Sequence, residues 1–111
     1  MPESTERGAL TEAVFYILLT LTKPTHGYGI MKFVNEISGG RVILGSGTLY
    51  GAINTLLKKR WIRISTADSG RKKDYEITDA GREVLESELE RLDELLKTGR
   101  NILEEGYEEQ G

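Results

Sequence analysis

The residues best suited to chemistry in this chain are cations that can bind phosphate. Arg71, Lys72 and Lys73 follow Gly70, where a tight turn would push them outward, and three more cations crowd at residues 58–60. Residues 1–75 carry 11 Lys and Arg against 6 Asp and Glu, whereas residues 76–111 carry 4 against 12, and the whole chain sums to −3. A clustered basic surface attracts polyanions. The pattern predicts a DNA-facing part followed by a partner-facing part.

A second set of polar side chains lies between Gly45 and Lys59. If this segment is a helix, hydroxyls near its start can bind a phosphate oxygen together with the free backbone N–H groups. Asn54 and Thr55 can hydrogen-bond base edges, since Asn favours adenine. The alternative is that Thr48 and Tyr50 only cap or pack. The candidate DNA-contacting residues are Ser46, Thr48, Tyr50, Asn54, Thr55, Lys58, Arg71, Lys72 and Lys73.

Catalytic and cofactor chemistry is not indicated. The chain has no cysteine, which excludes disulfides and thiol nucleophiles, and His26 is its single histidine. Residues 40–46 hold two glycines separated by four residues, as in a P-loop, but the essential lysine is missing. No apolar run approaches the roughly 20 residues that span a membrane, and residues 1–8 lack a signal-peptide layout. We expect a cytoplasmic protein that is not an enzyme, with no catalytic residue, metal or cofactor.

The elements that must position these residues follow from the apolar periodicity. A first helix has one apolar face with i, i+3, i+4, i+7 spacing from Leu10 to Leu21, with Thr11 as its N-cap and Pro24 ending it. Further apolar side chains lie off this face, so we expect more than one side of the helix to be covered, by its own domain and by another chain. These side chains are Phe15, Tyr16 and Leu19.

Two more helices and a hairpin complete the predicted DNA-binding unit. Thr25 is a candidate N-cap for a second helix that Gly39-Gly40 stops, and the β-branched residues 41–44 favour a brief strand. A third helix follows Ser46 and turns its apolar residues inward, so its polar residues point outward. Residues 61–66 and 74–78 predict two strands joined by a turn. The fold class is mainly α with a small β-hairpin wing (α+β).

The C-terminal segment carries a leucine pattern of another kind. From Leu85 its apolar positions and Gly99 are spaced by 4, 3, 4, 3 and 4 residues, which is a heptad seam. A helix over residues 79–105 spans about 40 Å and overhangs a domain of about 13 Å radius of gyration. Gly106 is expected to end it. A second copy of the chain is the nearest apolar surface for this seam, so the predicted dimerisation residues are Leu85, Leu89, Leu92, Leu96 and Leu103.

Four motifs in order give the sequence a specific resemblance. They are His26-Gly27-Tyr28-Gly29, Gly39-Gly40, Gly47-Thr48-Leu49-Tyr50, and Arg71-Lys72-Lys73 leading into Tyr75-Glu76-Ile77-Thr78-Asp79-Ala80-Gly81. Over residues 10 to about 105 the chain resembles the short branch of the PadR-like transcriptional regulators. The resemblance implies a winged helix-turn-helix homodimer that inserts its third helix into the major groove and dimerises largely through the terminal helix. It also implies that a small-molecule effector, commonly aromatic or drug-like, can bind at or near the dimer interface.

The chain departs from that family pattern at several positions. Arg60 stands where many members have glycine in a left-handed turn, so we expect either that the helix ends differently or that Arg60 is mildly strained. Gly45 replaces a frequent serine, which moves the expected capping role to Ser46. Gly51 and Thr55 lie where many members carry larger or basic side chains, which weakens the case for direct base readout. The only tryptophan, Trp61, is not on the terminal helix, where drug-sensing members can carry one.

The residues and the resemblance together predict a homodimeric, sequence-specific regulator that binds an inverted-repeat operator and represses by occupying it. The predicted organisation is a polar lead (1–9), a winged helix-turn-helix domain (10–78), a dimerisation helix (79–105) and a flexible tail (106–111). Its partners would be double-stranded DNA and a second copy of the chain, with no membrane. Two alternatives stay open: a non-specific or architectural DNA-binding protein, and an adaptor whose leucine-rich helix binds a different protein.

Overall fold

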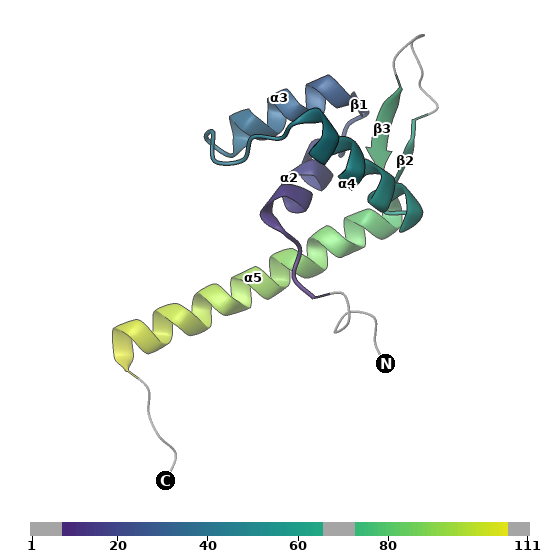
Figure 1. Cartoon of the computed structure of the whole chain (residues 1–111). Coiled ribbons are helices and arrows are strands. Elements are labelled where there is room, and N and C mark those ends of the chain that lie inside the picture. The colour runs from purple at the N-terminus through teal and green to yellow at the C-terminus, as the bar shows by residue number, and fades with distance from the viewer. Residues whose placement is uncertain (1–7, 66–72, 107–111) are drawn as a thin grey trace.

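The structure, a computed structural model, describes residues 8–65 and 73–106. The elements in chain order are α2 (Glu12–Thr20), β1 (Thr25–His26), α3 (Gly27–Ile37), α4 (Ser46–Lys58), β2 (Ile62–Ile64), β3 (Asp74–Ile77) and α5 (Asp79–Glu105). Three helices gather around a small antiparallel sheet, and the long α5 runs beneath them and projects past them (Figure 1). The predicted fold class, mainly α with a β-hairpin wing and a long C-terminal helix, is confirmed.

The sheet has a strand that the sequence reasoning missed. Its order is β1-β3-β2, with Thr25 opposite Tyr75 and Ile62 opposite Ile77. Thr25 therefore lies in a strand and does not cap α3, and its hydroxyl donates to the Lys23 carbonyl at 2.9 Å. The strand predicted over residues 41–44 is absent from the described chain, because this segment is a connection that places Leu44 in the core.

The core lies where α2, α3 and α4 pack together and is closed by β2, β3 and the start of α5. Each helix contributes apolar residues at helical spacing, which is why the periodicity located them. Tyr28 on α3 lies outside this core and is 67% exposed. The buried apolar residues are Ile17, Leu18, Leu21, Ile30, Val34, Leu44, Leu49, Ile53, Leu56, Ile62, Tyr75, Ile77 and Leu85.

Helix α2 begins as predicted, with the Thr11 hydroxyl accepting the Val14 N–H at 3.1 Å. Its approach is tied to α5 by Glu88, whose side chain is 2% exposed. The Glu88 carboxylate accepts the Leu10 N–H at 3.3 Å and pairs with Arg91 at 2.5 Å. A buried carboxylate needs such partners, because removing an unpaired charge from water is costly. This acidic residue was not singled out from the sequence, where it looks like one more charge of a solvated helix.

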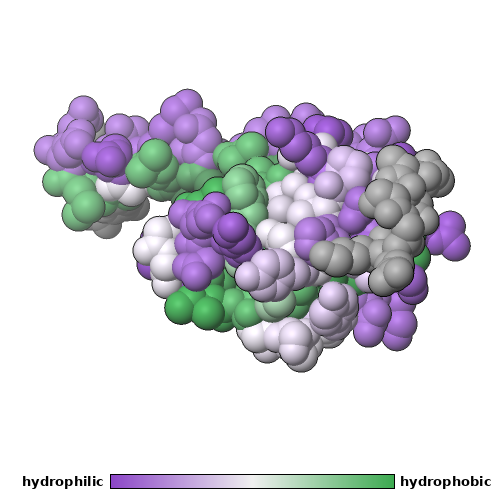
Figure 2. All heavy atoms as spheres, turned by 90° about the horizontal axis from the view of Figure 1, so that it is seen from above, coloured by the Kyte–Doolittle hydropathy of each residue, from purple (hydrophilic) through white to green (hydrophobic). Residues whose placement is uncertain are grey.

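Helix α5 has the predicted bounds. Thr78 is its N-cap, with its hydroxyl accepting the Gly81 N–H at 3.1 Å, and Gly106 ends it with φ 84°. Of the predicted seam, Leu85 packs into the core of its own chain, whereas the later leucines lie on the projecting part of the helix and are exposed, Leu103 by 88%. Hydrophobic atoms follow one side of this projection toward the body of the molecule (Figure 2).

Candidate nucleic-acid interface

Helix α4 presents the predicted polar residues on its exposed side. Leu49, Ile53 and Leu56 are buried and fix the orientation of the helix. Gly47 and Gly51 lie on the outward side, and a Cβ at either position would meet open space. All six candidates of this helix are exposed: Ser46, Thr48, Tyr50, Asn54, Thr55 and Lys58.

The start of α4 differs from the prediction. Gly45 occupies the N-cap position with φ −80° and ψ 165°, and no side chain caps the helix. Ser46 is the first helical residue, so its expected capping role is wrong. The reason is that the extended conformation of an N-cap falls one residue earlier, where glycine has no side chain to offer. The first turn contains no acidic residue, which leaves its N–H groups and the Ser46 hydroxyl suited to an external anion.

Tyr50 lies between α4 and α3. A Cβ at Gly27, the first residue of α3, would stand 2.1 Å from the Tyr50 hydroxyl oxygen, so a larger residue at this position would force the tyrosine ring to shift. Burial, and secondarily the proximity of Tyr50, raise the pKa of Tyr75 on β3. The Tyr50 hydroxyl thus lies close to the start of α3, while the residue as a whole stays 44% exposed. This position agrees with the packing alternative, and a phosphate contact stays a prediction.

Thr55 has a local hydrogen bond of its own. Its hydroxyl donates to the Gly51 carbonyl at 3.2 Å, one turn earlier in the helix. The residue also lines a hollow of about 260 Å³ beside Trp61, over whose ring the Lys59 ammonium lies 5.1 Å from the centroid. Because the Thr55 hydrogen is used within the helix, only its oxygen lone pairs remain for base contacts. Asn54 and Lys58 are exposed without such a bond in the described residues.

The wing carries cations that stand apart from this helix. Lys73 is exposed immediately before β3, while Arg71 and Lys72 lie outside the described residues, so their contact with DNA stays a prediction. Arg63 on β2 pairs across the sheet with Glu76 on β3 at 2.7 Å. The pair follows the register that sets Arg63 opposite Glu76, and it balances one of the wing's positive charges.

The end of α4 contains the strain expected at Arg60, whose φ is 64°. The Arg60 N–H donates to the Leu57 carbonyl at 3.0 Å and the Trp61 N–H to the Leu56 carbonyl at 3.1 Å. These two bonds form a Schellman turn, which requires a left-handed residue at this place. Arg60 is the one non-glycine residue with positive φ in the described part of the chain.

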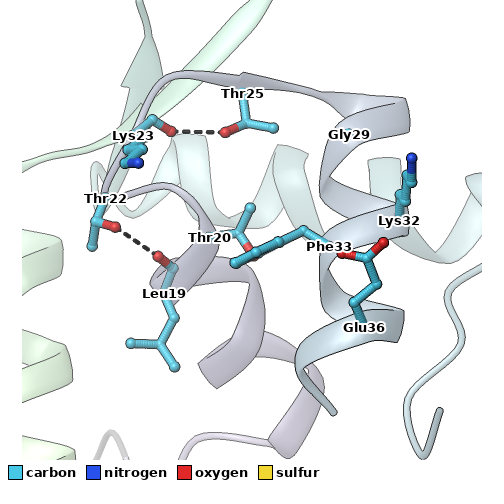
Figure 3. A pocket seen from close by; sticks show the side chains of 9 residues that line it. All are labelled: Leu19, Thr20, Thr22, Lys23, Thr25, Gly29, Lys32, Phe33 and Glu36. Carbon is cyan, nitrogen blue, oxygen red and sulfur yellow. Dashed lines mark hydrogen bonds between the residues drawn. The ribbon is translucent and has the colours of Figure 1, made fainter. Parts of the chain in front are cut away.

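A hollow of about 480 Å³ lies between the end of α2 and one side of α3 (Figure 3). Phe33 extends across it, and Lys23 and Lys32 stand on either side. The Thr22 hydroxyl donates to the Leu19 carbonyl at 2.9 Å, so this rim is internally bonded. Its full lining is Leu19, Thr20, Thr22, Lys23, Thr25, Gly29, Lys32, Phe33 and Glu36.

Neither a membrane-spanning helix nor a metal-binding cluster occurs among the described residues. No helix within residues 8–65 and 73–106 is long and apolar enough to cross a membrane. In the same residues no three or more His, Cys, Asp and Glu side chains gather in a way that could hold a metal ion.

Comparison with known proteins adds a family and several relatives. The family described as "Transcriptional regulator PadR-like family" matches residues 15–87. An uncharacterised 37.1 kDa protein in transposon TN4556 of Streptomyces fradiae is 43% identical over 65 residues, which cover 59% of this chain and 18% of that protein. The chain thus matches only a small part of that relative's length.

Solved structures of similar fold include two that bear on the candidate interface. A transcriptional regulator from Clostridium thermocellum has a TM-score of 0.68 at 20% identity, with 94% of this chain and 99% of that one covered. Bacillus subtilis PadR in complex with operator DNA has a TM-score of 0.59 at 26% identity, with 68% of this chain and 45% of that one covered. The first likeness concerns the fold alone.

Proposed function

Since the chain belongs to the PadR-like family of transcriptional regulators, we propose that it is a homodimeric repressor that binds an inverted-repeat operator in double-stranded DNA. The observation that carries this proposal is the exposed side of α4, where polar residues and two glycines face outward without a covering element in the described chain. A major groove admits a helix and offers donors and acceptors to such residues. The Bacillus subtilis relative is bound to operator DNA, which supports the same partner here.

In this proposal α4 gives the register and the wing gives affinity. Asn54 and Lys58 face base edges and phosphate, and the first turn of α4, which has no acid, lies against a phosphate. Arg71, Lys72 and Lys73 of each copy engage the flanking backbone. Two copies then neutralise about six phosphates, and log K falls with log salt with a slope of about −5.

The homodimer is proposed to form on the projecting part of α5. Its apolar side chains, Leu89, Leu92, Leu95, Leu96, Ile102 and Leu103, are all at least 40% exposed in the single chain. Fully burying an exposed leucine is worth about 1.5–3 kcal/mol, so covering these partly exposed side chains favours association. Two-fold symmetry satisfies it with one self-complementary contact.

A second element is proposed to join this contact. Leu95 and Ile102 lie beside the heptad seam, so the apolar stripe is wider than the narrow seam of a two-stranded coiled coil. Helix α2 offers the partly buried Phe15, Tyr16 and Leu19 on the side away from its buried Ile17 and Leu18. The partner's α5 lying against α2 covers both surfaces at once.

Selection of bound duplexes from a random pool tests the proposal. A palindromic consensus with half-sites about one helical turn apart is the expected result. A consensus without symmetry would refute the homodimer on an inverted repeat. Binding to all duplexes alike, without the roughly thousandfold preference of a specific regulator, would favour the architectural alternative.

Sedimentation equilibrium distinguishes the homodimeric regulator from the adaptor alternative. The proposed homodimer predicts a mass of twice 12.4 kDa at micromolar concentration. A monomer under these conditions would favour an adaptor that uses α5 to bind a different protein.

The proposed effector is a small molecule that binds beside Phe33 and loosens DNA binding. The hollow beside Phe33 falls within the 300–1,000 Å³ typical of small-molecule sites. A screen that follows operator release, repeated with Phe33→Ala, assigns any responding compound to this hollow or away from it.

A further inference from the structure

The corner between α4 and β2 is fastened to the first turn of α5. Arg60 and Trp61 form this corner, and their N–H groups bond back to α4, whereas their carbonyls point to α5. The Thr78 hydroxyl donates to the Arg60 carbonyl at 2.7 Å, and the Thr78 N–H donates to the Trp61 carbonyl at 2.9 Å. Thr78 thus donates hydrogen bonds to both carbonyls of the corner.

The same Thr78 hydroxyl also caps α5. Its oxygen accepts the Gly81 N–H at 3.1 Å while its hydrogen goes to Arg60. A hydroxyl is able to donate once and accept at the same time. The end of α4 and the start of α5 therefore share one side chain, and a group that only capped α5 would not need to donate.

Gly81 lets the two backbones approach. A Cβ at this position would lie 2.2 Å from the Trp61 carbonyl oxygen and 2.7 Å from the Ile77 side chain. The Trp61 carbonyl belongs to the backbone and the Ile77 side chain is buried in the core, so neither can move away easily. The first turn of α5 therefore lies directly against the corner. The close approach explains why Thr78 and Gly81, three residues apart, occur together in the motif that follows β3.

We propose that Thr78 is a positioning residue, which fixes the end of α4 to the dimer helix and so sets the distance between the two α4 helices of a homodimer. This inference rests on the proposed function, in which α5 holds the two copies together. The Schellman bonds of Arg60 and Trp61 tie the corner only to α4 itself. Among the described side chains, the Thr78 hydroxyl is the one that hydrogen-bonds the start of α5 to Arg60, the residue with the left-handed backbone. Operator spacing then depends on it.

The chain is suited to a direct distance measurement because it contains no cysteine. A nitroxide attached to Lys58→Cys, at the exposed end of α4, reports the distance between the two α4 helices in the free dimer by double electron–electron resonance. Thr78→Val removes both hydroxyl bonds at nearly constant shape, and Thr78→Ser restores them. Thr11→Val is the matched control, since Thr11 caps α2 with the same kind of bond.

A narrow distance distribution is expected for the labelled parent, for Thr78→Ser and for Thr11→Val. In Thr78→Val the odds of the docked corner fall about fivefold, the equivalent of about one hydrogen bond, and the distribution broadens or splits. Equal widths in Thr78→Val and Thr11→Val, with both folded, would overturn the inference and leave the homodimer standing. A monomer with no intersubunit distance would overturn the proposed homodimer, and this inference with it.

Discussion

Replacing Arg60 by glycine is expected to stabilise the protein, because Arg60 holds a left-handed backbone with φ 64°. This conformation costs an L-residue with a Cβ about 1–2 kcal/mol. Glycine removes that cost but adds about 0.5–1 kcal/mol of entropy to the unfolded chain. The net gain in the free energy of unfolding is therefore about 0–1.5 kcal/mol, with a central value of about 0.8 kcal/mol. The Schellman bonds at this corner use backbone atoms only and survive the change.

Urea unfolding followed by circular dichroism measures this gain. At constant protein concentration, which an oligomer requires, the midpoint rises by about 0.5 M with an unchanged slope. Arg60→Ala is the first control, because it removes the side chain and keeps the strain. Gly39→Ala is the second, since Gly39 has φ 66° with open space around a Cβ, and it should lose about what Arg60→Gly gains. A glycine variant no more stable than the alanine variant would refute the account of Arg60 as strained.

Three further predictions concern binding and assembly. Lys72→Ala should reduce the slope of log K on log salt by about two per dimer and weaken binding to all sequences alike. An unchanged slope would reject the wing contact. Lys97→Ala is the control, because Lys97 pairs with Asp93 on α5 at 3.0 Å. Leu96→Asp should give a folded monomer in the ultracentrifuge, because this leucine is 53% exposed in the single chain, and a persistent dimer contradicts the proposed interface. Gly51→Ala should raise the free energy of unfolding by about 1 kcal/mol and yet weaken DNA binding, and a variant that binds as tightly as the parent rules out a close approach of DNA at Gly51.

The helices were predictable because their information is local and repeated. In α5 the bounds follow from a Thr-Asp-Ala-Gly start, a leucine repeat and a terminal glycine, each of which acts within one or two turns. The cap at Thr11 is equally local. The leucine pattern of α5 does not indicate which leucine packs against the core of its own chain. Leu85 reads like the rest of the seam, and only tertiary packing against the core separates it.

The sheet was harder to predict than the helices, because the two residues of β1 are too few to show a periodic pattern. Thr25 and His26 form β1 only because β3 passes beside them, so nothing within the segment distinguishes a strand from a capped helix start. Residues 41–44 show the converse. Their β-branched composition favours a strand, but no strand of the described chain pairs with them. Strand propensity measures fit to a neighbouring strand, and without the neighbour it has little meaning.

The site divides in the same way. Which side of α4 points outward followed from its apolar residues, and the six candidates are all exposed. What each side chain does depends on partners distant in sequence or on local alternatives. Tyr50 packs over Gly27, and the Thr55 hydroxyl bonds back to Gly51. Asn54 and Lys58 have neither commitment among the described residues, which makes them the stronger candidates for base and phosphate contacts.

Three locally unfavourable choices of this chain lie in and around α4, and Gly99 in α5 is another. Gly47 and Gly51 weaken a helix in which a Cβ would meet open space, and Arg60 occupies a left-handed position that glycine would fill without strain. Neither choice improves the packing of the described chain. Natural sequences tend to break local rules where function requires it. Helix α4 has destabilising glycines on its exposed side and a cation at its strained end, and binding to an external polyanion explains this better than folding does. Gly51→Ala tests that explanation directly, because it should raise stability and lower DNA affinity.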